Sequence, residues 1–133
     1  MLVVIVLVYG SMRRGVFSIS EINIVTGSAM TLILAATGQT LVLLRGGIDL
    51  SIGGMISLAT VIAATQFGTD PLRILAVSLA ILTLGFVVGA ANGVLISVLK
   101  LQPFLVTLAS WSILSGAAMI VLPTDGGAVP SWW

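Results

Sequence analysis

The sequence predicts an all-α protein, a polytopic transmembrane helix bundle with about five spans. Of the 133 residues, 59% are hydrophobic and 7% are charged, whereas a soluble domain carries about 25% charged residues. Uncharged stretches separate the charges, and several of them are long enough as helices to cross the roughly 30 Å hydrocarbon core of a bilayer. We therefore expect a single transmembrane domain over residues 1–133.

Five uncharged segments are the expected spans. At the N-terminus the apolar run precedes an arginine pair, which is the reverse of the order in a signal peptide. The third segment is the shortest, about 25 Å as a helix, so it crosses untilted or begins inside the membrane after a short non-helical stretch. The spans are expected at about 1–10, 22–44, 51–67, 74–99 and 104–122.

Composition argues against several functional classes. The net charge of +1 provides no basic stripe for nucleic acid. The chain has no Cys and no His, so disulfides, thiolate chemistry, most zinc sites and the commonest general base are missing. No GxxxxGK(S/T) phosphate-binding loop is found in the sequence. We expect no catalytic residue, no metal site and no cofactor.

The segment GGIDLSIGG predicts a break between two helices. Gly46 and Gly47 together make a continuous helix costly, by about 1 kcal/mol each relative to Ala. After them, Asp49 or Ser51 can accept hydrogen bonds from the free N–H groups that start the next helix. The alternative interpretation is a proton or sodium site at a broken helix, as in secondary transporters.

Two carboxamides, Gln39 and Asn92, fall within expected spans. An unsatisfied polar group in hydrocarbon costs several kcal/mol, so each side chain must face protein or water. One interpretation is an interhelical hydrogen bond, and the other is a pore-lining group in the substrate pathway. The hydroxyls of the last span can bond carbonyls of their own helix, so we assign no role to Thr107, Ser110, Ser112 and Ser115.

Small residues recur every four positions in the fourth span. Gly85, Gly89, Gly93 and Ser97 form a ridge along one helical face. Because helices in lipid associate where small residues let backbones approach, we expect this ridge to be a helix-packing surface.

Three stretches resemble one protein family in the same order. The run GQTLVLLRGGIDLSIGGMISLATVIAA, residues 38–64, resembles the signature region of bacterial ABC importer permeases for ribose, xylose, galactosides and related compounds. The runs FSISEINIV, residues 17–25, and NGVLISVLKLQPFLVTLASWSILSGAAMIV, residues 92–121, are similar to flanking regions of the same family. The resemblance covers nearly the whole chain.

The resemblance implies a type II importer permease in the bacterial cytoplasmic membrane. Two permease copies would form a path between an extracytoplasmic sugar-binding protein and a pair of cytoplasmic ABC ATPase subunits, surrounded by membrane lipid. It also implies that Arg45 and Lys100 face the cytoplasm, whereas the count of positive residues on the two sides, two against three, sets no orientation. Family members continue through further spans, so we expect the N-terminal part of such a permease.

Two other functional classes stay open. One is a fragment of an ion-coupled secondary transporter, which predicts uptake that collapses with the ion gradient. It also fits a non-conducting membrane scaffold subunit, which predicts co-purification with partners but no solute flux.

Overall fold

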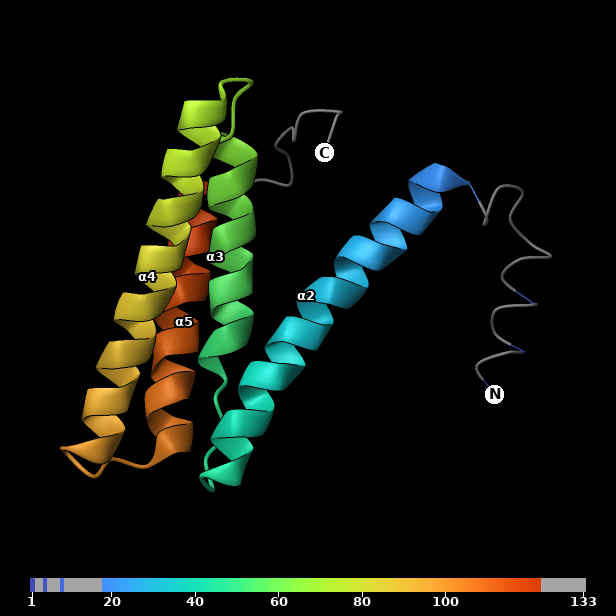
Figure 1. Cartoon of the computed structure of the whole chain (residues 1–133). Coiled ribbons are helices and arrows are strands. Elements are labelled where there is room, and N and C mark those ends of the chain that lie inside the picture. The colour runs from blue at the N-terminus through green and yellow to red at the C-terminus, as the bar shows by residue number, and fades with distance from the viewer. Residues whose placement is uncertain (2–3, 5–7, 9–17, 123–133) are drawn as a thin grey trace. The chain divides into compact units, whose positions relative to one another are not determined.

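The computed structural model describes residues 1, 4, 8 and 18–122. Within this part the chain forms four long helices, α2 (Ile19–Leu44), α3 (Ser51–Gln66), α4 (Pro71–Ser97) and α5 (Pro103–Val121) (Figure 1). The described residues contain no β-strand, which confirms the all-α prediction. Helices α2 to α5 coincide with four of the expected spans to within a few residues. The span expected at 1–10 lies largely outside the described residues.

Three of these helices have the length and composition of membrane spans. They are α2, α4 and α5, with 26, 27 and 19 residues. Helix α3 has 16 residues and a length of about 24 Å, below the thickness of the hydrocarbon core. The expected membrane helix bundle is therefore found, with one short member.

The chain divides into two compact units, Met1–Leu41 and Val42–Trp133. In the first unit, α2 begins where the Ser18 hydroxyl accepts a hydrogen bond from the Glu21 N–H at 3.3 Å. The hydroxyls of Thr31 and Thr37 bond carbonyls one turn back on the same helix, so they need no partner from another helix. The expectation of a single transmembrane domain stays a prediction.

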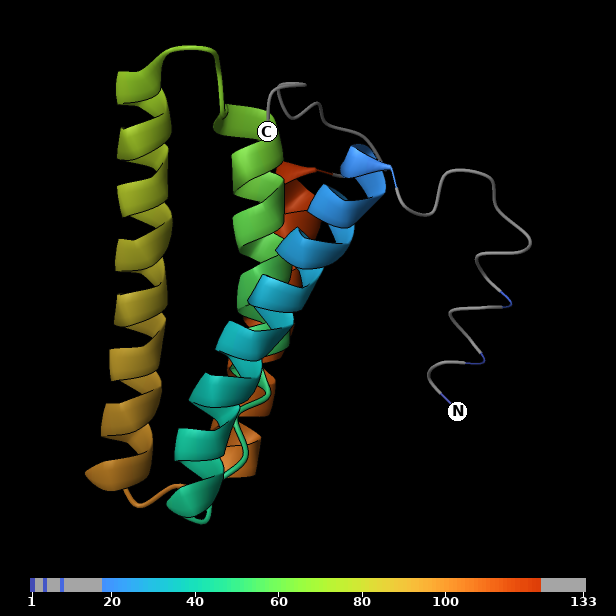
Figure 2. The ribbon, with the colours of Figure 1, turned by 45° about the vertical axis from the view of Figure 1, so that its right-hand side comes forward.

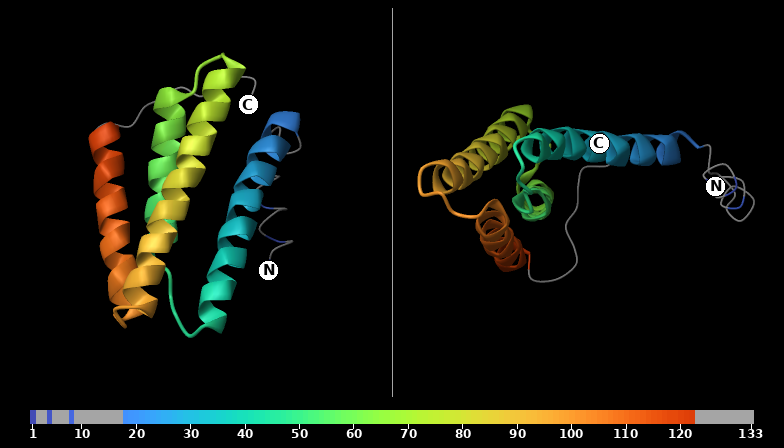
Figure 3. Two further views of the ribbon diagram at one scale, coloured as in Figure 1. Left: turned by 60° about the vertical axis from the view of Figure 1, so that its left-hand side comes forward. Right: turned by 90° about the horizontal axis from the view of Figure 1, so that it is seen from below.

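The second unit is a bundle of α3, α4 and α5, joined by two short loops. Helices α3 and α5 run in the same direction and α4 runs against both (Figures 1 and 2). Viewed along its axis, the bundle has the three helices at the corners of a triangle (Figure 3, right). The turns containing Arg45 and Lys100 therefore lie at the same end of this unit, as the sequence predicts.

Two prolines fix the starts of α4 and α5. Each is in the first turn of its helix, where the missing N–H costs nothing and the fixed φ suits the helix. In addition, the Asp70 carboxylate accepts a hydrogen bond from the Leu72 N–H at 3.2 Å and caps α4. The turn at Gly68–Arg73 thus ends one hydrophobic run and starts the next.

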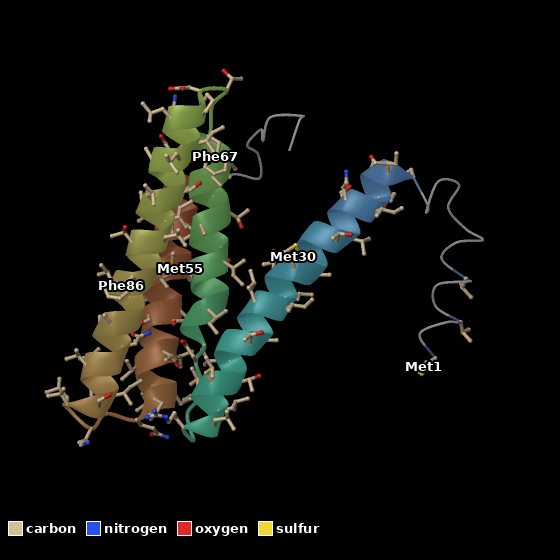
Figure 4. The ribbon with its side chains drawn as sticks, in the orientation of Figure 1. Met1, Met30, Met55, Phe67 and Phe86 are labelled. Atoms are coloured by element: carbon tan, nitrogen blue, oxygen red, sulfur yellow. The ribbon has the colours of Figure 1, made fainter. Side chains whose placement is uncertain are left out.

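The apolar core of the second unit is small, and most large apolar side chains point outward. Leu58, Leu114 and Ala118 form the buried cluster. Phe86 and Ile120, by contrast, are 76% and 81% exposed, and Figure 4 shows Phe86 on the outer side of α4. A soluble monomer rarely exposes so much apolar surface, so these faces suit lipid or further helices.

Helices α3 and α5 meet most closely at Gly54. A Cβ atom there would lie 2.9 Å from the Trp111 carbonyl oxygen and 3.0 Å from the Leu114 Cβ. The α3 backbone therefore rests directly on α5, which only a glycine permits. At the neighbouring Gly53, an added Cβ would meet the Trp111 ring at 3.5 Å, an ordinary contact distance.

We predict that Gly54→Ala lowers the free energy of unfolding by about 1–3 kcal/mol, because the added methyl group forces α3 and α5 apart. Gly53→Ala is the matched control and should be neutral or slightly stabilising, since alanine favours helix by about 1 kcal/mol. Thermal unfolding followed by circular dichroism in one detergent measures both. Equal melting temperatures for the two variants would contradict the close contact.

Candidate functional site

The break after α2 is a Schellman motif. The Gly46 N–H donates to the Leu43 carbonyl at 2.9 Å, and the Gly47 N–H donates to the Val42 carbonyl at 3.1 Å. Gly46 has φ +76°, in the left-handed region that glycine enters without a steric penalty. The first glycine of the pair therefore ends α2 and satisfies two of its last carbonyls.

The chain next runs in a non-helical conformation along the first turns of α5. Gly47 is buried, and a Cβ atom there would lie 3.3 Å from Val42 Cγ1 and 3.5 Å from Pro103 Cβ. One residue on, the Ile48 carbonyl accepts a hydrogen bond from the Thr107 hydroxyl at 3.1 Å. Thr107 is 2% exposed. A protein group thus replaces water at the Ile48 carbonyl, as irregular backbone in a membrane requires.

Asp49 stabilises the start of α3. Its Oδ1 atom accepts hydrogen bonds from the Ser51 N–H at 2.8 Å and from the Ser51 hydroxyl at 2.5 Å. The N–H is one of the free donors at the helix start, where the helix dipole also favours a negative charge. Ser51 itself is 5% exposed.

The hydrogen bonds continue from Ser51 to both other helices. On α4, the Asn92 amide nitrogen Nδ2 donates to Ser51 Oγ at 3.2 Å. On α5, the Ser110 hydroxyl donates to Asn92 Oδ1 at 2.6 Å. Asn92 is 5% exposed and is the buried residue of α4. One chain of side-chain hydrogen bonds, which we call the polar chain, therefore links Asp49, Ser51, Asn92 and Ser110.

The carboxylate sets the direction of the polar chain. An ionised carboxylate only accepts hydrogen bonds, so the single hydroxyl hydrogen of Ser51 is used on Asp49. Ser51 Oγ can then only accept, which requires the nitrogen of the Asn92 amide to face it. The Asn92 oxygen consequently faces Ser110, which must donate. Every donor points toward Asp49, an arrangement in which the bonds strengthen one another.

The polar chain lies inside the bundle rather than at its end. Asn92 comes about 8 Å before the end of α4 and Ser110 about 10 Å after the start of α5, at 1.5 Å per residue. Ser51, the first residue of α3, bonds at this depth. Helix α3 therefore starts partway along α4 and α5, and a start inside the membrane stays a prediction.

Two adjoining cavities lie between α4 and α5 and share Leu95, Ser110 and Ile113. Their volumes are about 360 and 270 Å³. The larger reaches Gln102 at the loop end, and the smaller has Asn92 in its lining. We call them together the α4–α5 groove. Its lining is mainly aliphatic, and the Asn92–Ser110 pair contributes polar groups to it.

The relatives found by comparison with known proteins are all named as permease proteins. No protein-family model and no solved structure matches the chain. The ribose import permease protein RbsC of Escherichia coli is 33% identical over 129 residues, which are 96% of this chain and 39% of that protein. The fructose import permease protein FruF of Bifidobacterium longum is 38% identical over 94 residues, 71% of this chain and 26% of that protein.

Over the region that it spans, this chain is similar in sequence to ABC transporter permeases. A further relative, the inner membrane ABC transporter permease protein YjfF of Escherichia coli, is 39% identical over 99 residues, 74% of this chain and 30% of that protein. The chain spans about two fifths or less of the length of these relatives. With three helices that are long and apolar enough to cross a membrane, this chain is a multi-pass protein of the bacterial cytoplasmic membrane.

The structure brings together three of the residues singled out in the sequence. Asp49, Ser51 and Asn92 form consecutive links of the polar chain. Asn92 makes the interhelical hydrogen bonds of one interpretation and also lines the groove. Gln39 is half-buried on α2, in the other compact unit.

The glycine ridge of α4 has little contact with the helices of its own unit. At Gly85 an added Cβ would meet Met55 Cε at 3.7 Å, and Figure 4 shows Met55 on α3 beside α4. At Gly89 and Gly93 no atom of another described helix lies within 4 Å of that position. The role of this ridge in helix packing stays a prediction.

Sequence reasoning missed Thr107 and Ser110. Both were expected to satisfy themselves on their own helix, and Thr107 does bond the Pro103 carbonyl at 3.0 Å in addition to Ile48. A signal was present in their spacing, because Thr107, Ser110 and Leu114 fall on one face of α5. That face is the one buried against α3 and α4.

We predict that Thr107→Val destabilises this chain by about 1–3 kcal/mol, because the Ile48 carbonyl loses its side-chain donor in a buried site. Thr83→Val is the matched control, since the exposed Thr83 hydroxyl bonds the Leu79 carbonyl of its own helix at 2.8 Å. Thermal unfolding measures the stability, and amide hydrogen exchange at residues 46–50 should be faster in Thr107→Val alone. Unchanged exchange there would argue against the bond.

Proposed function

We propose that this chain forms part of the membrane pathway of an ABC importer for a neutral sugar. The observation that carries the proposal is the similarity to import permeases for ribose and fructose over most of the chain. A third relative, the autoinducer 2 import system permease protein LsrC of Photorhabdus luminescens, is 34% identical over 110 residues. All three relatives are named as import permeases of small organic solutes.

In the proposed mechanism the chain is a transport subunit without an ATPase site. ATP hydrolysis takes place in a pair of cytoplasmic ABC ATPase subunits, and an extracytoplasmic binding protein delivers the sugar. Docking of the loaded binding protein and ATP binding then shift the population between inward-open and outward-open states. A second permease copy completes the pathway.

Within this mechanism, Asn92 and Gln39 are the proposed solute contacts. Asn92 supports this role because it combines a place at membrane depth with a position in the lining of the α4–α5 groove. The break at Gly46, Gly47, Asp49 and Ser51 holds the start of α3 at that depth and so positions Ser51 against Asn92.

We propose that the glycine ridge of α4 packs against a helix supplied by another part of the assembled importer. Gly89 and Gly93 are exposed and open, which leaves room for close backbone approach. Gly85, which already contacts Met55, is covered in part.

The transport proposal is tested by uptake of radiolabelled D-ribose. The chain is expressed together with a candidate ABC ATPase and a candidate sugar-binding protein, in cells that lack their own ribose importer. We expect uptake that is abolished when the ATPase phosphate-loop lysine is replaced by alanine and that survives a protonophore. Survival without the ATPase together with collapse under the protonophore would favour an ion-coupled transporter. Co-purification of all partners without flux would favour a scaffold.

We predict that Gly93→Leu does not lower the thermal stability of the isolated chain, because no other described helix lies near the added side chain and leucine favours helix over glycine. The same substitution should prevent assembly with the other importer subunits, measured by co-purification from membranes. Phe86→Leu, an exposed apolar exchange on the same helix, is the control. Normal assembly of Gly93→Leu would contradict the packing role of the ridge.

A further inference from the structure

The polar chain leaves unused hydrogen-bonding capacity at the α4–α5 groove. An asparagine side chain offers two N–H donors and two acceptor positions. Asn92 uses one donor on Ser51 and one acceptor position on Ser110. One N–H and one lone pair of Asn92 therefore remain beside a groove whose other lining residues are mainly aliphatic.

Ser110 has a defined chemical character in this groove. Its one hydroxyl hydrogen is used in the 2.6 Å bond to Asn92 Oδ1, so its remaining capacity is that of an acceptor. Ser110 is half-buried and lines both cavities of the groove. A group that approaches Ser110 from the groove must donate a hydrogen bond to it.

We infer, on the basis of the proposed transport function, that the α4–α5 groove binds a neutral polyhydroxylated solute and that Ser110 selects one of its hydroxyl groups as a donor. An alkyl chain or an apolar helix in the groove would leave the spare groups of Asn92 and Ser110 without partners, which is unfavourable in a membrane. An ion would find no charged residue in the lining. The cavity volumes, about 360 and 270 Å³, suit a small solute.

Asp49 is a positioning residue for this selection. It does not line the groove, but its negative charge fixes the Ser51 hydroxyl, and through it the Asn92 amide and the Ser110 hydroxyl. If residue 49 could donate, the order could reverse. Ser51 would then donate to the Asn92 oxygen, Asn92 would donate to Ser110, and the Ser110 hydrogen would become available to the groove.

The test uses the chain in lipid nanodiscs and the side-chain amide signal of Asn92 in nitrogen-15 NMR. The probes are D-ribose and fully O-methylated ribose, which keeps the acceptors and lacks the hydroxyl donors. We expect D-ribose to shift the Asn92 signal in a saturable way and the methylated derivative to shift it at least about tenfold more weakly, since 1.4 kcal/mol is a factor of ten. Equal effects of the two probes would overturn the inference.

Variants of α5 distinguish the loss of a hydrogen bond between Ser110 and the solute from a general disturbance of the fold. Ser110→Ala should weaken the effect of D-ribose about tenfold, corresponding to the loss of one hydrogen bond, and Ser110→Thr, which keeps the hydroxyl, should restore it. Ser112→Ala is the matched control, because the exposed Ser112 hydroxyl bonds the Leu108 carbonyl of its own helix at 3.0 Å. A loss of equal size in Ser112→Ala would count against Ser110.

Asp49→Asn tests the direction of the polar chain. Asparagine can donate to Ser51, so the preference for D-ribose over the methylated derivative should fall toward one, with the chain still folded. A preference as large as in wild type would overturn the positioning role of Asp49.

The uptake assay distinguishes this inference from the proposed function. ATP-dependent ribose uptake together with no preference between the probes would overturn the groove site and leave the permease function standing. Selective binding of D-ribose without uptake would support the site and sink the transport proposal. Persistent contacts between lipid acyl protons and Ile113 at saturating D-ribose would identify lipid as the occupant and overturn the site.

Discussion

Backbone groups that leave a helix inside a membrane need partners from the protein, and this requirement shapes the region between α2 and α3. Here the Schellman motif satisfies the end of α2, Thr107 donates to the Ile48 carbonyl, and Asp49 accepts from the Ser51 N–H. Each partner holds another element in place. The non-helical stretch can therefore exist at depth because α5 lies against it, and α3 can start there because Asp49 has already met its first free donor.

The need to satisfy buried polar groups also sets how the three helices of the second unit align along one another. Its apolar core is small, and lipid supplies no hydrophobic force that would drive one helix against another. Close backbone contact at Gly54 and the hydrogen bonds through Asn92 therefore decide how α3, α4 and α5 align. In a soluble bundle a buried carboxamide is often replaceable by an apolar residue, whereas here it joins three helices at one level.

Sequence reasoning succeeded where the physics is local. The four helices follow from uncharged runs, the break from the adjacent glycines, and the bond between Asp49 and Ser51 from the chemistry of a helix start. It missed Ser110 and Thr107 because a serine or threonine hydroxyl can bond a carbonyl of its own helix. The amino-acid sequence therefore does not reveal whether that hydroxyl also bonds another element. It also favoured the glycines of α4 as a contact and overlooked Gly54, because composition shows which helices can approach closely but not which neighbours they have.

The contact at Gly54 also limits how the bundle of α3, α4 and α5 can rearrange. Because the α3 backbone rests on the Trp111 backbone with no side chain between them, rotation of either helix would bring bulky groups into collision. Helices α3 and α5 should consequently move as one rigid body. Tilting is then left to α4, which is held at Asn92 but meets α3 at Gly85 only through the flexible end of Met55. A tilt of α4 about Asn92 would open or close the groove beside it.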